Sequence, residues 1–234
     1  MILIFISLLP GLLIGIWVYY LDKYEKEPVG LMLRAFFFGS LSTIPAMAFQ
    51  IIFKNYENPY SLIETAFFTF CVVAFSEETS KYYFLRKYIY QNQEFDEPID
   101  GVIYGTMIGM GFATTENILY VLGEYGGYST AIGRAFTAVP AHAIFAIFMG
   151  AYMGLAKFNP LYKRFFMLKG WLLAVFFHGL YDFFLIQKAH EELMILSLLT
   201  LFWGWVLARR IIRISQELSP FRDNPKVKQP SSVV

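Results

Sequence analysis

Seven long apolar stretches constrain the fold of this chain more than any other feature. They run over approximately residues 1–21, 29–53, 61–84, 101–122, 130–156, 169–187 and 192–212. A membrane-spanning helix needs about 20 predominantly apolar residues. The polar connections between these stretches are too short to fold by themselves. We therefore predict an all-α fold, a polytopic transmembrane helix bundle with about seven spans.

The composition supports an integral membrane protein. Hydrophobic residues make up 57% of the chain and charged residues only 16%, whereas soluble domains carry about 25% charged residues. The net charge of +1 gives no reason to expect a nucleic acid partner. The expected surroundings are a lipid bilayer.

We predict two regions along the chain. Residues 1–216 should form one integral membrane domain, and the Pro-rich, polar residues 217–234 should form a disordered tail. The first apolar stretch has no basic segment before it and no A-x-A-like cleavage site after it. We therefore expect it to be a retained helix rather than a signal peptide.

The positions of the basic residues predict the orientation. With seven spans and a cytoplasmic C-terminus, 14 of the 19 Lys and Arg residues fall in cytoplasmic segments and three on the opposite side. Cytoplasmic loops carry the excess of Lys and Arg in membrane proteins. We expect insertion in the plasma membrane with the N-terminus outside. The stretch 61–84 is the least certain span, because charged residues interrupt it.

Several ionisable side chains lie well inside these apolar stretches. A charged side chain at the bilayer centre costs at least about 2.5–3.5 kcal/mol on insertion scales. A group of them in different spans therefore indicates that they face one another in a single polar cavity. The six residues are Glu77, Glu78, Glu116, His142, His178 and Asp182.

The first group combines two adjacent carboxylates with a lysine. Glu77, Glu78 and Lys81 lie on one predicted helix, and residues three or four apart share a face. Lys81 can then neutralise one carboxylate and leave the other as a general base. The alternative is that the helix ends close to these residues, which would then form a salt bridge near the membrane surface.

The second group follows a stripe of small residues. Gly101, Gly105 and Gly109 recur every four residues, a pattern that allows two membrane helices to approach closely. Glu116 and Asn117 follow the stripe on the same helix. The close packing should bring this carboxylate and amide inward.

The two histidines could be polar groups held in place by a carboxylate, or they could bind a metal. His178 and Asp182 are spaced i, i+4, so Asp182 can fix the tautomer of His178 or share a metal with it. Zinc in hydrolytic sites takes three protein ligands and a water. His178, His142, Glu116 and Glu78 are the candidate ligands. A glutamate that activates water without a metal remains an equal alternative at this point.

Three short motifs in this chain resemble those of the PrsW-type intramembrane proteases. This family belongs to the superfamily of the CAAX prenyl endopeptidases and bacteriocin-immunity proteins. Residues 77–81 (EETSK) match the Glu-Glu motif with its following basic residue. Residues 112–116 (FATTE) match Phe-x-x-x-Glu, and residues 178–182 (HGLYD) match His-x-x-x-Asp. The segments 22–28 (DKYEKEP) and 95–105 (FDEPIDGVIYG), together with Arg34, are also similar to the family.

The resemblance implies hydrolysis of a peptide bond in or near the membrane. It implies that Glu77 and Glu78 supply the water-activating carboxylates and that His178 is an essential polar or metal-binding group. In the best-known case the substrate is a membrane-bound anti-sigma factor, so a single-pass membrane protein is the expected partner. Glu116 stands where the wider superfamily has His, so prenylated substrates are not implied.

Two other classes of function remain as alternatives. One is a non-proteolytic immunity or partner-binding protein of the same superfamily, which would not need to keep the Glu pair and His178. The other is a proton-coupled transporter, which would carry inverted repeats with broken helices at matching positions. The sequence has no such repeat.

Overall fold

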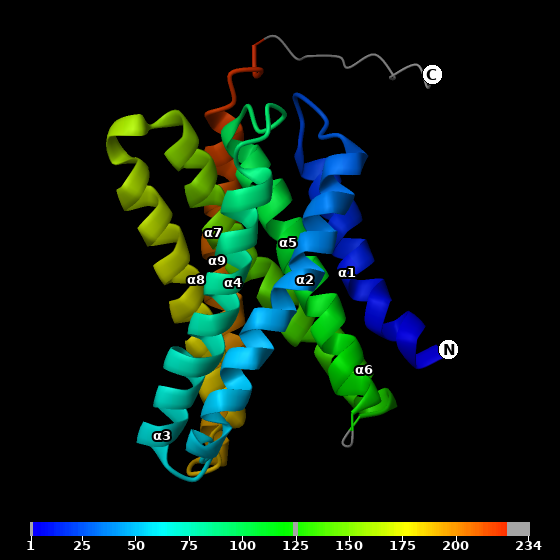
Figure 1. Cartoon of the computed structure of the whole chain (residues 1–234), viewed down its shortest axis with the longest axis vertical. Coiled ribbons are helices and arrows are strands. Elements are labelled where there is room, and N and C mark those ends of the chain that lie inside the picture. Colours follow the sequence, from blue (N-terminus) through cyan, green and yellow to red (C-terminus); the bar gives the residue numbers. More distant parts are fainter. Residues whose placement is uncertain (1, 124–125, 224–234) are drawn as a thin grey trace.

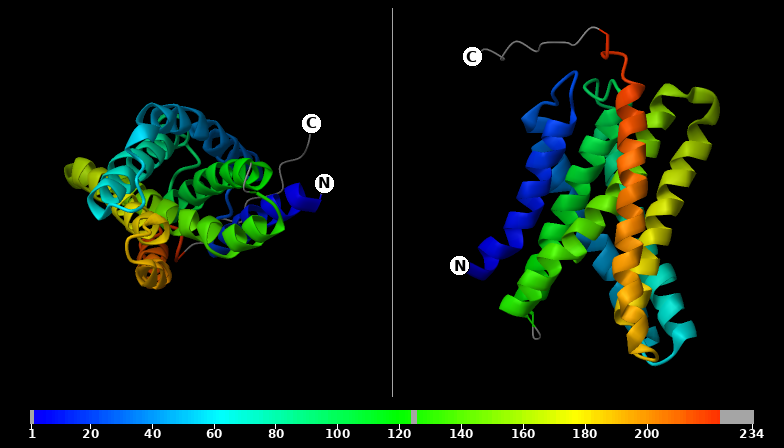
Figure 2. Two further views of the ribbon diagram at one scale, coloured as in Figure 1. Left: turned by 90° about the horizontal axis from the view of Figure 1, so that it is seen from below. Right: turned by 180° about the vertical axis from the view of Figure 1, so that it is seen from behind.

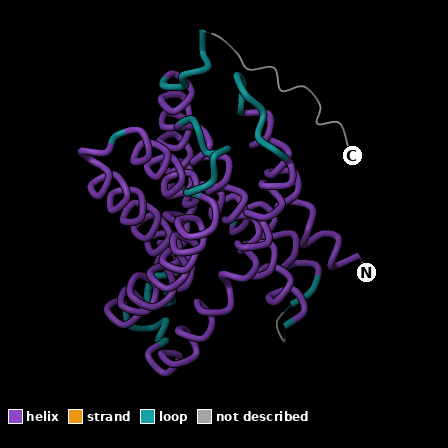
Figure 3. Tube along the Cα trace, turned by 45° about the horizontal axis from the view of Figure 1, so that its top comes forward, coloured by secondary structure: helices purple, strands orange, loops and turns teal. Residues whose placement is uncertain are grey.

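The computed structural model describes residues 2–123 and 126–223, and these residues form helices with short connections and no strand (Figure 1). Non-helical segments are confined to the connections, most of them at the two ends of the bundle (Figure 3). The α-helices of the described residues are α1 Ile2–Leu21, α2 Val29–Phe53, α3 Leu62–Ala66, α4 Phe75–Phe84, α5 Pro98–Leu122, α6 Tyr128–Phe136, α7 Ala138–Phe158, α8 Lys163–Ile186 and α9 Ile195–Glu217. The all-α prediction is confirmed.

Five helical segments of the described chain are long and apolar enough to cross a membrane. They are 2–21, 29–56, 128–158, 160–186 and 191–217. The other two expected spans, 61–84 and 101–122, are also helical. Helix α5 is almost wholly buried among the other helices, so it does not need a strongly apolar surface. The count of seven spans stays a prediction.

Two expected spans are less regular than the hydropathy pattern suggests. The stretch 61–84 consists of α3, a π-helical segment Phe67–Ala74 and α4. The stretch 130–156 is divided between α6 and α7 at Thr137. Pro140 accounts for this break, because a proline ring clashes with the carbonyl four residues earlier, here that of Phe136.

The predicted disordered tail is only partly within the described residues. Glu217 is the last residue of α9, and residues 218–223 continue as a non-helical segment. Residues 224–234 lie outside the described part of the chain. Seen from behind, α9 runs along the outside of the bundle (Figure 2), where it packs against α7 and α8.

The glycine stripe of α5 packs directly against α7. A Cβ atom on Gly105 would lie 2.8 Å from the Cα of Gly150, and one on Gly109 would lie 3.2 Å from the carbonyl oxygen of His142. Only glycine allows this approach. The predicted close packing is confirmed, and it brings the C-terminal half of α5, with Glu116, beside His142.

Buried acidic groups join the connections at one end of the bundle. The Tyr104 hydroxyl donates a hydrogen bond to Glu27. The Asp100 carboxylate accepts from the backbone N–H groups of Asp96 and Glu97, at 2.7 and 2.8 Å. Burial raises the pKa of Glu97 to about 7. These contacts tie the segment before α2 to the start of α5, so both sequence segments that resemble the family meet here.

Candidate active site

Helix α4 holds Glu77, Glu78 and Lys81 in the interior of the bundle. Their exposed fractions are 2%, 0% and 1%. The Lys81 ammonium lies 2.7 Å from Glu78 Oε1 and 3.5 Å from Glu77 Oε2. The helical backbone continues beyond α4 to Ile89. The ion pair is therefore buried within the helix, and the alternative of a salt bridge at a misplaced helix end is wrong.

Helix α8 presents His178 between carboxylates of two helices. Its Nδ1 lies 2.8 Å from Glu78 Oε1, and its Nε2 lies 3.1 Å from Asp182 Oδ2. The i, i+4 spacing places His178 and Asp182 on one face, as the sequence pattern predicts. Because both ring nitrogens face carboxylate oxygens, the orientation of this imidazole is fixed from two sides.

Helices α5 and α7 add a second histidine–carboxylate pair. His142 Nε2 lies 3.0 Å from Glu116 Oε2, and His142 Nδ1 lies 3.1 Å from the Lys81 ammonium. An ammonium group only donates hydrogen bonds. Nδ1 therefore accepts, and Nε2 carries the proton that it donates to Glu116. The contact to Lys81 fixes the tautomer of His142.

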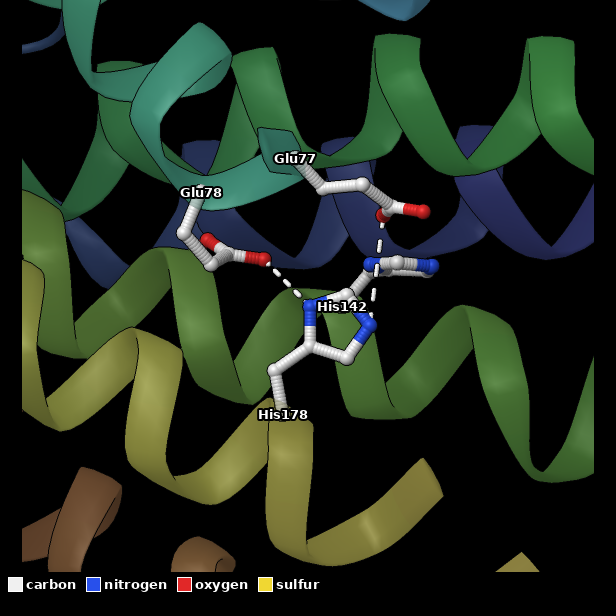
Figure 4. Close-up of side chains that lie close together, drawn as sticks. All are labelled: Glu77, Glu78, His142 and His178. Carbon is white, nitrogen blue, oxygen red and sulfur yellow. Dashed lines mark hydrogen bonds and ion pairs between the residues drawn. The ribbon is translucent and has the colours of Figure 1, made fainter. Parts of the chain in front are cut away.

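These contacts join the six expected residues into one network. The rings of His142 and His178 are 5.1 Å apart, and Lys81 links the Glu78 side of the network to the His142 side. Glu116 and Glu78 have no direct contact within the described chain and are connected through Lys81 and His142. Figure 4 shows Glu77 and Glu78 from α4, His142 from α7 and His178 from α8 pointing toward one another.

The network lines a cavity of ≈ 380 Å³. Glu77 is at its wall, with Oε1 accepting a hydrogen bond from Gln50 Nε2 at 3.0 Å. The buried Oε2 of Glu77 has no hydrogen-bond partner within the described chain. Glu78 lies behind the wall. The other expected residues at the wall are Glu116, His142, His178 and Asp182.

Arg134 of α6 is a member of this site that we did not expect from the sequence. Its guanidinium lies 2.6 Å from Glu116 Oε2, donates to Asn117 Oδ1 at 3.1 Å, and stacks on the ring of Tyr120 at 4.0 Å. The side-chain amide of Asn117 in turn donates to the carbonyl of Ser7 in α1. Asn117 therefore supports Arg134 and does not reach the two histidines.

Gln50 of α2 is the other unexpected member. It is the only polar residue between Thr43 and Lys54 in the sequence. That isolation within an apolar span was the signal that could have identified it. For Arg134 the sequence offered a competing explanation, since a basic residue next to a loop is common in membrane proteins.

The site has the donor chemistry of a divalent metal centre. Glu77, Glu78, His142 and His178 each offer a ligand atom, and these four atoms all lie within 4.8 Å of one another. One buried oxygen of Glu77 and one of Glu78 lack a hydrogen-bond partner among the described residues. Glu116, which we expected as a ligand, is outside this group and pairs with Arg134 and His142 instead.

The charge of the network also fits a divalent cation. Glu77, Glu78, Glu116 and Asp182 are four carboxylates, and Lys81 and Arg134 are the two cations that contact them. With both imidazoles neutral, the form in which a histidine ligates a metal, the network carries two unbalanced negative charges. Buried charges are stable only when they are paired. A divalent cation would supply the missing charge.

Comparison with known proteins identifies the family. A sequence model described as PrsW family intramembrane metalloprotease matches residues 27–208. The chain belongs to this family. It is therefore a membrane-embedded peptidase, a hydrolase, as the three motifs imply.

Curated relatives agree with this assignment. Protease PrsW of Geobacillus kaustophilus is 38% identical over 196 residues, which cover 83% of this chain and 85% of the relative. Protease PrsW of Bacillus subtilis is 33% identical over 201 residues, covering 86% and 90%. That of Clostridioides difficile is 30% identical over 200 residues, covering 83% of each chain. No solved structure matches this chain.

Proposed function

We propose that this PrsW family member is an endopeptidase that cuts a single-pass, membrane-anchored regulatory protein, such as an anti-sigma factor. The observation that carries the proposal is Glu77 Oε2 at the wall of the ≈ 380 Å³ cavity, which accepts no hydrogen bond from the described residues and has the Lys81 ammonium only at ion-pair distance, 3.5 Å. A buried carboxylate oxygen that accepts no hydrogen bond is costly. An attacking water or a substrate group would supply that hydrogen bond.

In this proposal Glu77 is the general base. Its Oε2 takes a proton from the attacking water while Gln50 holds Oε1 in place. The water oxygen bonds to the carbonyl carbon of the scissile peptide, the C–N bond breaks, and the proton passes from Glu77 to the leaving amine.

We further propose zinc as the metal, held by Glu78, His142 and His178. These residues give the three protein ligands of a hydrolytic zinc site and leave Glu77 for proton transfer. Bound zinc lowers the pKa of a coordinated water and polarises a carbonyl group. The Lys81 ammonium contacts two of these ligands, so the metal would take over part of the charge balance that Lys81 provides.

Metal analysis of the purified enzyme tests the zinc assignment. We expect close to one zinc per chain in the wild type and a loss of zinc in His178→Ala, with peptidase activity removed by a chelator and restored by zinc. Full activity after complete removal of metal would make the zinc assignment wrong but would leave the peptidase assignment intact.

Co-expression with candidate single-pass membrane proteins tests the function. Wild type should release a shortened product from at least one candidate, and Glu78→Gln should not, because Glu78 holds both Lys81 and His178. Equal cleavage by the wild type and the variant would contradict the proposed site. Cleavage of soluble proteins alone would contradict the proposed substrate class.

We propose a seven-span domain over residues 1–216 in the plasma membrane, with the N-terminus outside and the C-terminus in the cytoplasm. The distribution of Lys and Arg supports this orientation. A reporter that is active only in the cytoplasm should work when fused after Lys163 or Val234 and be silent after Asn58. A silent fusion after Val234 would show that the number of spans is miscounted.

A further inference from the structure

A second cavity lies on the other side of the helix that carries the Glu pair. It has a volume of ≈ 390 Å³ and lies between α4 and α8, at the end of the bundle where α8 begins. Two arginines, Arg86 and Arg164, line it together with aromatic and apolar side chains, and none of its lining residues is acidic. The principal uncharged members are Tyr82, Met167, Leu168 and Trp171.

The two arginines differ from four lysines at the same end of the bundle. No ion pair, hydrogen bond or ring contact involves Arg86 or Arg164 within residues 2–123 and 126–223. These four lysines have such partners. Lys87 donates to the hydroxyl of Tyr83, Lys157 donates to the carbonyl of Tyr90, Lys163 lies over the ring of Tyr90, and Lys169 lies over the ring of Tyr152. Two guanidinium groups without an ion-pair or hydrogen-bond partner among the described residues therefore line this cavity.

The chemistry of this cavity matches the headgroup region of an anionic phospholipid. Guanidinium groups bind phosphate oxygens through pairs of parallel hydrogen bonds. Tyr and Trp are enriched where a membrane protein meets the headgroups. Leu168 is 54% exposed and offers an apolar surface beside the arginines. We propose that Arg86 and Arg164 bind the phosphate of an anionic phospholipid, with an acyl chain along Leu168 and Trp171.

This lipid site is connected to the active site through α4. The indole N–H of Trp171 donates to Thr79 Oγ1 at 3.1 Å, and its ring meets that of Phe75 edge-on at 5.7 Å. Thr79 directly follows Glu78. A lipid in the cavity would therefore stabilise the pairing of α4 with α8, the helices that carry Glu78 and His178.

Tryptophan quenching in vesicles tests the proposal with the full-length protein. Trp171 is made the only tryptophan by replacing Trp17, Trp203 and Trp205 with Phe. The probes are phosphatidylglycerol and phosphatidylcholine with brominated acyl chains, which quench a tryptophan that they contact. We expect brominated phosphatidylglycerol to quench Trp171 at a lower mole fraction than brominated phosphatidylcholine. Arg86→Gln/Arg164→Gln should weaken this preference about tenfold or more.

The matched control is Lys87→Gln/Lys169→Gln, which removes the same charge from the same end of the bundle but leaves the cavity unchanged. It should keep the preference for phosphatidylglycerol. Equal quenching by the two lipids in the wild type, or the same loss in both double variants, would overturn the proposal. Displacement by inorganic phosphate would also overturn it, because the ligand would then be a free anion. Because binding is the readout, the result does not depend on the proposed peptidase mechanism.

Discussion

Replacing Glu77 with Gln should lower the rate of peptide hydrolysis by about 10³, because a positioned general base contributes about 10²–10⁴ to a rate. The change removes a negative charge but keeps the shape of the side chain. Gln50 can still pair with the new amide, so the fold and the amount of protein in the membrane should not change. The measurement is single-turnover cleavage of a substrate by purified enzyme.

Glu64→Gln is the control for this experiment. Glu64 precedes Glu77 in the same helical stretch and is exposed, and it is not part of the network around Glu77. Its variant should cleave at the wild-type rate. If Glu77→Gln also cleaved at the wild-type rate, Glu77 would not be the base, and the lack of a hydrogen bond to its Oε2 at the cavity wall would need another explanation.

The sequence predicted which residues turn inward but not which atoms meet. Charges inside apolar spans had to face one another, since exposure to lipid is so costly. The glycine stripe of α5 also predicted its close partner surface. The pairing of Glu116 with Arg134 depends on where α6 ends, and the break at Thr137 that sets this position lies inside a stretch that hydropathy reads as one span.

The helix face on which Glu77 and Glu78 lie could also not be predicted from a 3.6-residue periodicity alone. The π-helical segment Phe67–Ala74 directly precedes α4. A π-helix repeats with one more residue per hydrogen-bonded turn than an α-helix, so residues before and after it do not follow one 3.6-residue pattern. Position along the span could be predicted from hydropathy. The direction in which Glu77 points, and hence its contact with Gln50 of α2, required the three-dimensional structure.

Removing the guanidinium of Arg134 is the other substitution with a large expected effect. In Arg134→Leu, Glu116 would keep its negative charge at a side-chain exposure of 18% with no cation to balance it. Removing one partner of a buried ion pair lowers the stability by about 3–5 kcal/mol. We expect a value near the lower limit, because this pair is partly exposed. We expect a lower unfolding temperature in detergent and a loss of cleavage, because His142 loses its fixed acceptor when Glu116 moves.

A double-mutant cycle separates this role from a general loss of packing. Glu116→Gln/Arg134→Leu leaves no unpaired charge, and an amide oxygen at position 116 still accepts the hydrogen bond from His142. The double variant should therefore be more stable than Arg134→Leu alone. Lys188→Leu, which removes an exposed cation from the same end of the bundle, should unfold like the wild type. If the Glu116 and Arg134 effects on stability were simply additive, the two side chains would not act as a pair, and α6 would have no part in holding the active site.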